Sequence, residues 1–319
     1  MNLLVLGLLV CVGYGESESL LPTDSIPQAS NGNITFAPDA NQRLFDGGTN
    51  RLPFQSDGEF ESFIGPITNP ILSKDPRSNT YLRGLFINNQ FPGDHALGGG
   101  SAQIYAIQAN VALTERLSII ADKDGLARVD TSGGIHETGW LNLAAGLKYT
   151  FWRDVENQTL GAIGFMYEIP TGGANVFQNH GSGVFTAFLT GGQRIGDSIH
   201  VLNTVGWQFP VDSFYNSGFI YNSFHIDKAI NEWLYPLMEV NLYHYTGSGQ
   251  YLPGVVGEGD GLLNLGTADV TGNTIVTMAF GMKAKINCNL ECGAAYEFPI
   301  SDRKDLLENR IVTELILRY

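Results

Sequence analysis

Twelve segments of this chain alternate apolar and polar residues, and this pattern constrains the fold more than any other feature. Alternation with a period of two is typical of β-strands that have one apolar and one polar face. Strands of soluble sandwiches are usually about five or six residues long, whereas a tilted strand needs roughly 9–11 residues to cross a bilayer. Every segment here is long enough to cross: 80–91, 101–113, 117–129, 138–152, 159–169, 183–195, 198–210, 217–229, 233–246, 273–285, 289–299 and 307–319.

The alternation separates two kinds of side chain on each predicted strand. Along residues 141–151 the apolar set is Leu141, Leu143, Ala145, Leu147, Tyr149 and Phe151, and the opposite set is Asn142, Ala144, Gly146, Lys148 and Thr150. Residues 276–283 behave in the same way. One face is apolar enough for lipid, and the other is polar enough for an aqueous lumen. A mean hydropathy of −0.02 fits this arrangement, because the two faces cancel.

The connections between segments also alternate, in length. Short links at 114–116, 153–158, 196–197, 229–232 and 286–288 are interleaved with longer ones, such as 92–100, 130–137, 170–181 and 247–272. Short turns on one side and long loops on the other are typical of bacterial outer-membrane barrels. An even number of strands returns both chain ends to the short-turn side.

We therefore predict an all-β fold: a transmembrane, up-and-down antiparallel β-barrel of about twelve strands over residues 80–319. This fold places the chain in the outer membrane of a diderm bacterium, with the lipid bilayer as a partner. The competing fold is a soluble all-β sandwich. It would need strands about half as long and a second sheet to cover the outward apolar residues.

Two segments precede the predicted barrel. Residues 1–15 are predicted to be a signal peptide, because the apolar stretch from Leu3 to Gly13 is too short to span a bilayer and small residues follow it. Residues 16–79 are irregular and rich in Pro, Asn, Asp and Gly, so we expect a periplasmic or lumenal plug. Its apolar residues are candidates for packing inside the barrel: Phe60, Phe63, Ile64 and Ile67.

The last predicted strand ends in an aromatic residue, with apolar residues at alternate positions before it. Tyr319, Leu317 and Leu315 share this outward parity. A terminal strand of this kind resembles the signal that the outer-membrane assembly machinery reads, and we expect that machinery to be a partner.

The inward parity of the strands collects charged residues in the lumen. The candidates for lining or constricting it are Arg83, Lys148, Glu168, Arg194, Glu239, Lys283, Glu297, Arg310, Glu314 and Arg318. A lone charge in a confined space is costly, so opposite charges are expected to pair. Either these pairs stiffen the wall, or some of the groups form a selective constriction that acts on solutes.

Other kinds of site have less support. A net charge of −14 argues against a nucleic-acid partner. We expect no catalytic, metal or cofactor site. The nearest alternative is an arrangement similar to the omptin barrel proteases, with Asp122 and Asp124 facing His225 and Asp227.

Two cysteines near the end of the chain lie only four positions apart. Cys288 and Cys292 are expected either to form a disulfide across a tight turn or to be free, buried thiols.

One stretch carries a family resemblance. Residues 146–173, GLKYTFWRDVENQTLGAIGFMYEIPTGG, are followed by GSGVFTAFLTGGQRIGD and HVLNTVGWQF. This resembles the outer-membrane "meta-pathway of phenol degradation" transporter-like barrels, over roughly residues 101–319. The resemblance implies passive passage of small solutes, hydrophobic or aromatic ones among them. The alternatives are a structural or surface-display barrel with a blocked lumen and, more distantly, an omptin-like hydrolase.

Overall fold

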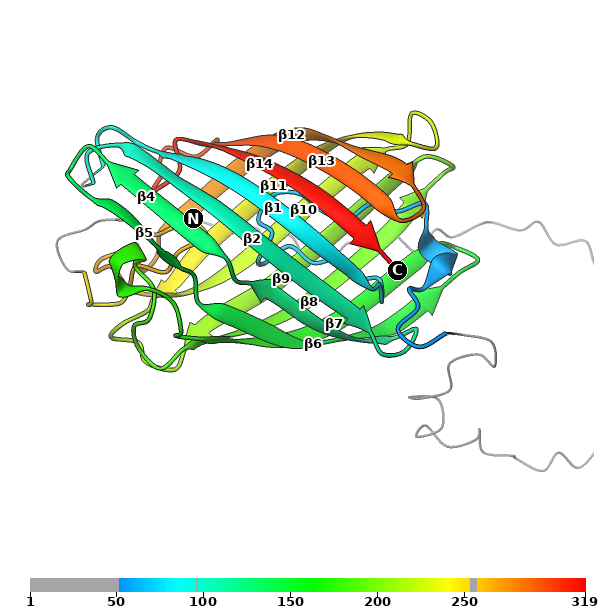
Figure 1. Ribbon diagram of the computed structural model, residues 1–319, viewed down its shortest axis with the longest axis horizontal. Helices are drawn as coiled ribbons and strands as arrows, with labels where there is room; N and C mark the ends of the chain where they lie inside the picture. The colour runs from blue at the N-terminus through cyan, green and yellow to red at the C-terminus, as the bar shows by residue number, and fades with distance from the viewer. Residues whose placement is uncertain (1–51, 96, 253–256) are drawn as a thin grey trace, which may run out of the picture. The chain divides into compact units, whose positions relative to one another are not determined.

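The alternating segments form one antiparallel sheet that closes on itself (Figure 1). The computed structural model describes residues 52–95, 97–252 and 257–319. Their strands are β1 (Tyr81–Phe91), β2 (Gly100–Ala112), β3 (Leu117–Lys123), β4 (Leu126–Thr131), β5 (His136–Trp140), β6 (Leu143–Asp154), β7 (Thr159–Ile169), β8 (Val184–Ile195), β9 (Ile199–Pro210), β10 (Gly218–Lys228), β11 (Leu234–Gly247), β12 (Thr274–Asn287), β13 (Leu290–Pro299) and β14 (Asn309–Arg318). Two 3₁₀ turns, η1 (Gly58–Phe60) and η2 (Ala174–Val176), accompany them.

Twelve of these strands make the ring, which confirms the predicted fold class. The order runs β1-β14-β13-β12-β11-β10-β9-β8-β7-β6-β3-β2, and pairing of β1 with β2 closes it. Closure satisfies main-chain groups strand to strand without leaving an open edge, as a hydrocarbon environment requires. Among the described residues, no helix is long and apolar enough to cross a membrane.

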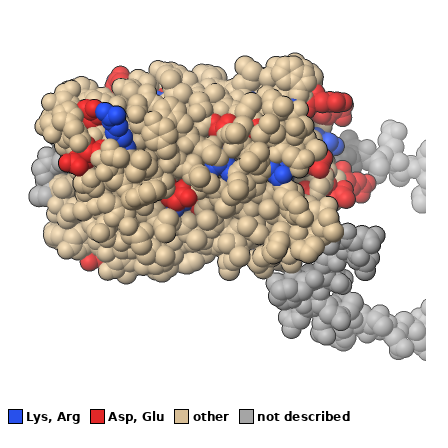
Figure 2. Space-filling model, in the orientation of Figure 1, with Lys and Arg blue, Asp and Glu red and all other residues tan. Residues whose placement is uncertain are grey.

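The two faces of the wall differ as the alternation predicted. Outward residues such as Leu147, Ile163 and Met282 are each more than half exposed, whereas Lys148 and Lys283 point inward and are almost fully buried. Figure 2 shows acidic and basic side chains at the two ends, and a surface between them that is mostly uncharged with a few charged side chains. This outer surface suits contact with lipid.

Aromatic side chains cluster on neighbouring strands towards the long-loop end. Phe165 and Phe185 stack with ring centroids 5.1 Å apart, and Trp207 lies 4.6 Å from Phe209. Aromatic belts of this kind mark the interface between hydrocarbon and water.

Two predicted strands are interrupted, which corrects the sequence analysis. The segment 117–129 divides into β3 and β4, and 138–152 divides into β5 and β6. At the first break Gly125 has φ of 106°, and a Cβ there would lie 2.2 Å from the Tyr105 carbonyl oxygen. Leu141, expected to face lipid, is instead 4% exposed and packs inward. β4 continues along β2, and β5 pairs with β4.

Side chains replace main-chain pairing at this interruption, which we call the seam (residues 122–125 and 141–142). The Asp124 carboxylate accepts a hydrogen bond from the Ile107 amide at 2.8 Å. The Asn142 side-chain oxygen accepts from the Gly172 amide at 3.0 Å. At the seam, therefore, side chains accept main-chain hydrogen bonds that a neighbouring strand would accept in a regular sheet.

Both ends of the described chain lie at the short-turn end of the barrel. The Tyr319 amide donates to the Thr80 carbonyl at 3.0 Å, and the Ser56 amide donates to the Tyr319 carbonyl at 3.3 Å. The predicted signal peptide, residues 1–15, and the first part of the irregular segment, up to residue 51, lie outside the described residues.

Candidate functional site: the plugged lumen

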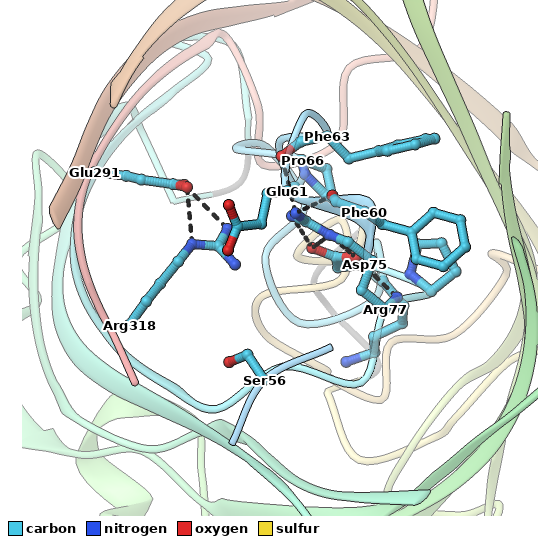
Figure 3. Close-up of polar contacts among 12 residues, drawn as sticks. Ser56, Phe60, Glu61, Phe63, Pro66, Asp75, Arg77, Glu291 and Arg318 are labelled. Carbon is cyan, nitrogen blue, oxygen red and sulfur yellow. Dashed lines mark hydrogen bonds and ion pairs between the residues drawn. The ribbon is translucent and has the colours of Figure 1, made fainter. Parts of the chain in front are cut away.

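Residues 57–79 run inside the ring, and we call them the plug (Figure 3). The sequence cannot form a regular strand here, because Pro66, Pro70 and Pro76 lack an amide hydrogen. Asn69 adds a left-handed residue, with φ of 49°. Buried main-chain groups must still find partners, so those of the plug bond to side chains.

The wall supplies many of those partners at the middle of the plug. Glu239 on β11 accepts from the amides of Ile67 and Thr68 at 2.8 and 2.7 Å. Lys283 on β12 donates to the Gly65 carbonyl at 2.8 Å. Arg83 on β1 donates to the Ile67 carbonyl at 3.1 Å. Three strands, of which β11 and β12 are neighbours in the ring, thus hold one short stretch.

Further cations hold the two ends of the plug. Lys148 on β6 donates to the carbonyls of Asp75 and Arg77 at 2.5 and 2.7 Å. Lys285 donates to the Ser62 carbonyl at 3.2 Å. Within the plug, the Arg77 guanidinium binds the Asp75 carboxylate at 2.6 Å and the Phe63 carbonyl at 2.9 Å (Figure 3).

Several of the charged residues expected in the lumen pair with one another. Glu314 binds both Arg83 and Lys283, with the Lys283 contact at 2.5 Å. Arg310 pairs with Glu297 at 3.3 Å.

The remaining candidates have separate surroundings. Arg318 binds Glu291 at 2.8 Å (Figure 3), and Glu168 binds Lys123 at 2.6 Å. Arg194 is half-buried on β8. Lumenal pairing therefore accounts for part of the charge, and binding of the plug main chain accounts for much of the rest.

Sequence reasoning missed several residues of this network. Glu291 and Lys285 lie on the inward parity of β13 and β12, so strand alternation could have found them. Lys74 pairs with Asp122 at 2.5 Å from within the plug. No periodic signal marks Lys74, because its segment is not a strand.

The structure separates the residues of the omptin-like hypothesis into different contacts. Asp122 binds Lys74 of the plug, and Asp124 belongs to the seam. His225 instead contacts Asp227 of its own strand at 3.0 Å. The two carboxylates of the Asp-x-Asp pair therefore each have partners other than His225 and Asp227.

A loop covers the plug from the long-loop end, and we call residues 257–267 the lid. Glu258 is buried in it and accepts from the Ser217 hydroxyl at 2.6 Å and the Leu265 amide at 2.7 Å. Burial raises the pKa of the Glu258 carboxyl, and it raises that of Asp260 well above its usual range. A Cβ on Gly261 would lie 2.9 Å from Leu72 Cδ1, so the lid packs directly on the plug.

Two spaces adjoin this site. A cavity of about 30 Å³ lies between plug and wall beside Arg83, Gln108 and Asp122, which is room for one or two waters. On the outer surface, a groove of about 900 Å³ runs along the seam, lined mainly by apolar residues that include Tyr105 and Trp140.

Cys288 and Cys292 are both free thiols, so the disulfide left open by the sequence is not formed. Cys288 is exposed in the turn between β12 and β13, whereas Cys292 lies within β13 opposite Ala284. One thiol therefore lies in a turn and the other in a strand, and the two residues are not cross-strand partners.

The fold is similar to that of solved outer-membrane barrels. The COG4313 outer membrane channel from Pseudomonas putida F1 matches with a TM-score of 0.57 at 9% identity, over 81% of this chain and 100% of that chain. The NanC porin matches with a TM-score of 0.48 at 9% identity, over 75% and 99%. No family model and no curated protein matches the sequence, so the resemblance to the meta-pathway family is not confirmed.

Proposed function

We propose that this protein is an outer-membrane channel that passes small solutes by passive diffusion when the plug leaves the lumen. The observation that carries the proposal is how the plug is bound. Its main chain is held by side chains of the wall, such as Glu239 and Lys148, and it pairs with no strand of the ring. It can therefore move without opening the barrel.

The outer groove supports a proposal for the class of solute. Its lining residues Phe86, Tyr105, Ile107 and Leu143 are apolar and face lipid, next to the seam. Apolar surface of this kind favours small hydrophobic or aromatic molecules, which partition into it from water. We propose such molecules as the solutes, in agreement with the family that the sequence resembles.

A disulfide lock tests the role of the plug. The Asn69 side-chain nitrogen lies 2.8 Å from the Ser223 hydroxyl, so Asn69→Cys and Ser223→Cys place two thiols on facing positions of plug and wall. Loss of both free thiols on oxidation verifies that the lock has formed. Cys288→Ser and Cys292→Ser remove the native thiols. Single-channel currents in planar bilayers are then compared under oxidising and reducing conditions.

Recordings run from about pH 6 to about pH 10. We expect steady current steps from the reduced protein within this range, and their loss on oxidation at every pH. The matched control is Asn69→Cys alone, which conducts under both conditions. Equal currents from the locked and unlocked protein would show that the plug does not gate the lumen. Silence of the reduced and parent proteins would favour the surface-display alternative, with its permanently blocked lumen.

A further inference from the structure

Glu239 is a wall carboxylate that binds the plug through two main-chain amides and one side-chain hydroxyl. Its Oε1 accepts from the Ile67 amide at 2.8 Å and faces His225 Nδ1 at 2.7 Å. Its Oε2 accepts from the Thr68 amide at 2.7 Å and from the Thr68 hydroxyl. Four partners fill the acceptor directions of one buried carboxylate, so it holds the plug as an anion.

His225 lies between two carboxylates. Its Nδ1 faces Glu239 Oε1 at 2.7 Å, and its Nε2 faces Asp227 Oδ2 at 3.0 Å, with the side chain 1% exposed. A neutral imidazole has one donor and one acceptor nitrogen. One of the two contacts would then set a lone pair against a carboxylate oxygen. Both contacts are attractive only while the ring carries two protons.

The groups around this pair come from four strands and the plug. β10 contributes Asp227, whose other oxygen faces His200 Nδ1 of β9 at 2.8 Å. β11 contributes Glu239 and Tyr235, and Lys285 of β12 lies 4.8 Å from the Tyr235 ring. The plug contributes uncharged groups: Ile67, Thr68 and Phe63, whose ring lies 4.7 Å from that of His200. His225 is thus the cation that directly bridges Asp227 and Glu239.

We propose that His225 is a proton-operated latch on the plug. While it is an imidazolium, it fixes Glu239 against the Ile67–Thr68 amides and the plug stays seated. When pH rises and the ring loses a proton, it keeps one N–H, so one of the two carboxylates faces its lone pair. The two buried negative charges then have no cation between them, and Glu239 loses its fixed position. The plug is then released. The consequence for solute flow rests on the proposed channel function, whereas the latch itself concerns only the position of the plug.

Accessibility of a plug cysteine tests the latch without relying on current. Ser73 is buried in the plug and lies outside the latch, so Ser73→Cys is the reporter in a Cys288→Ser, Cys292→Ser chain. The probe is a membrane-impermeant, charged maleimide, applied to the detergent-solubilised barrel from about pH 6 to about pH 10. Native Cys288, which is exposed, supplies the reference rate in a Cys292→Ser chain, so that the chemistry of the thiolate cancels.

We expect normalised labelling of Ser73→Cys to rise about tenfold or more with pH, as loss of a charge-assisted hydrogen bond implies. His225→Gln should label fast at every pH, with a flat profile. His136→Gln should keep the parent profile, because His136 forms a similar 2.8 Å contact with Asp130 on the exposed surface. If His225→Gln does not form a heat-modifiable barrel, Glu239→Gln replaces it, with the same flat profile expected.

Two results would overturn the latch: flat labelling of the parent, or a normal pH rise in His225→Gln. Currents recorded from the same samples separate this inference from the proposed function. Labelling that rises with pH in a protein that never conducts supports the latch and refutes the channel. Steady currents with flat labelling do the reverse.

Discussion

Replacing Glu314 should destabilise the barrel more than replacing any exposed acidic residue. Its carboxylate is completely buried and binds two cations, Arg83 and Lys283, which come from different strands. Glu314→Gln keeps the shape and one acceptor oxygen but leaves two buried cations without an anion between them. Breaking a buried pair from one side costs about 3–5 kcal/mol, and we expect about 3 kcal/mol because the amide oxygen still accepts.

Heat-modifiable migration on gels measures this cost, because the folded barrel and the unfolded chain run differently. For a chain of this size each kcal/mol lowers the midpoint by roughly 2–4 °C, so Glu314→Gln should lower it by about 6 °C or more. The matched control is Asp130→Asn, which changes two exposed contacts, with Arg128 at 3.7 Å and with His136 at 2.8 Å. Exposed pairs contribute about 0–1 kcal/mol, so this midpoint should hardly move.

Equal midpoint shifts from the two substitutions, or a smaller shift from Glu314→Gln than from the control, would contradict this prediction. Either result would mean that water reaches the Glu314 carboxylate in the folded barrel. The expected loss of about 3 kcal/mol, which assumes that the Glu314 carboxylate is fully buried, would then be wrong.

Three further predictions concern the lid, the seam and the last strand. Burial raises the pKa of Asp260, so this carboxyl ionises at a lower pH in the unfolded chain than in the folded one, and the stability of the lid falls as pH rises. Proteolysis of the lid measured across pH should show this fall, and Asp260→Asn should flatten it. Asp124→Ala leaves the Ile107 amide without its acceptor and should lower the free energy of unfolding by about 1–3 kcal/mol, with faster entry of a hydrophobic dye into vesicles. Deleting Tyr319 should reduce the fraction of heat-modifiable barrel in the outer membrane of an expression host, whereas Tyr319→Phe should not.

The ring could be predicted because alternate side chains of each strand face two different environments, lipid outside and the polar lumen inside. Lys148 and Leu147 fall on opposite faces for the same reason that any adjacent strand residues do. The seam was missed because residues 117–129 keep their alternation across the break. Asp124-Gly125 is a turn signal, but inside a long alternating segment it looked like one polar residue followed by one small one.

The sequence indicated a plug inside the barrel as one of two alternatives, but the contacts of the plug could not be predicted in the same way. Its contacts join Ile67 to Glu239 and Gly65 to Lys283, residues that are far apart in the chain and are related by no period. Main-chain carbonyls and amides make most of these contacts, and every residue has them. The sequence could therefore indicate that residues 57–79 were irregular, but not which wall residues would bind them.

Because the plug is held by side chains, the stability of the wall and the strength with which the plug is bound depend on different contacts. Ladder hydrogen bonds between strands hold the ring, and a plug that leaves breaks none of them. Closure depends on separate side chains, so Lys148 can be changed to remove two plug contacts at once while the pairing of β6 with β3 and β7 is kept. A barrel built in this way can change how tightly its plug is held by single substitutions in the lumen, without weakening the strand pairing of the ring.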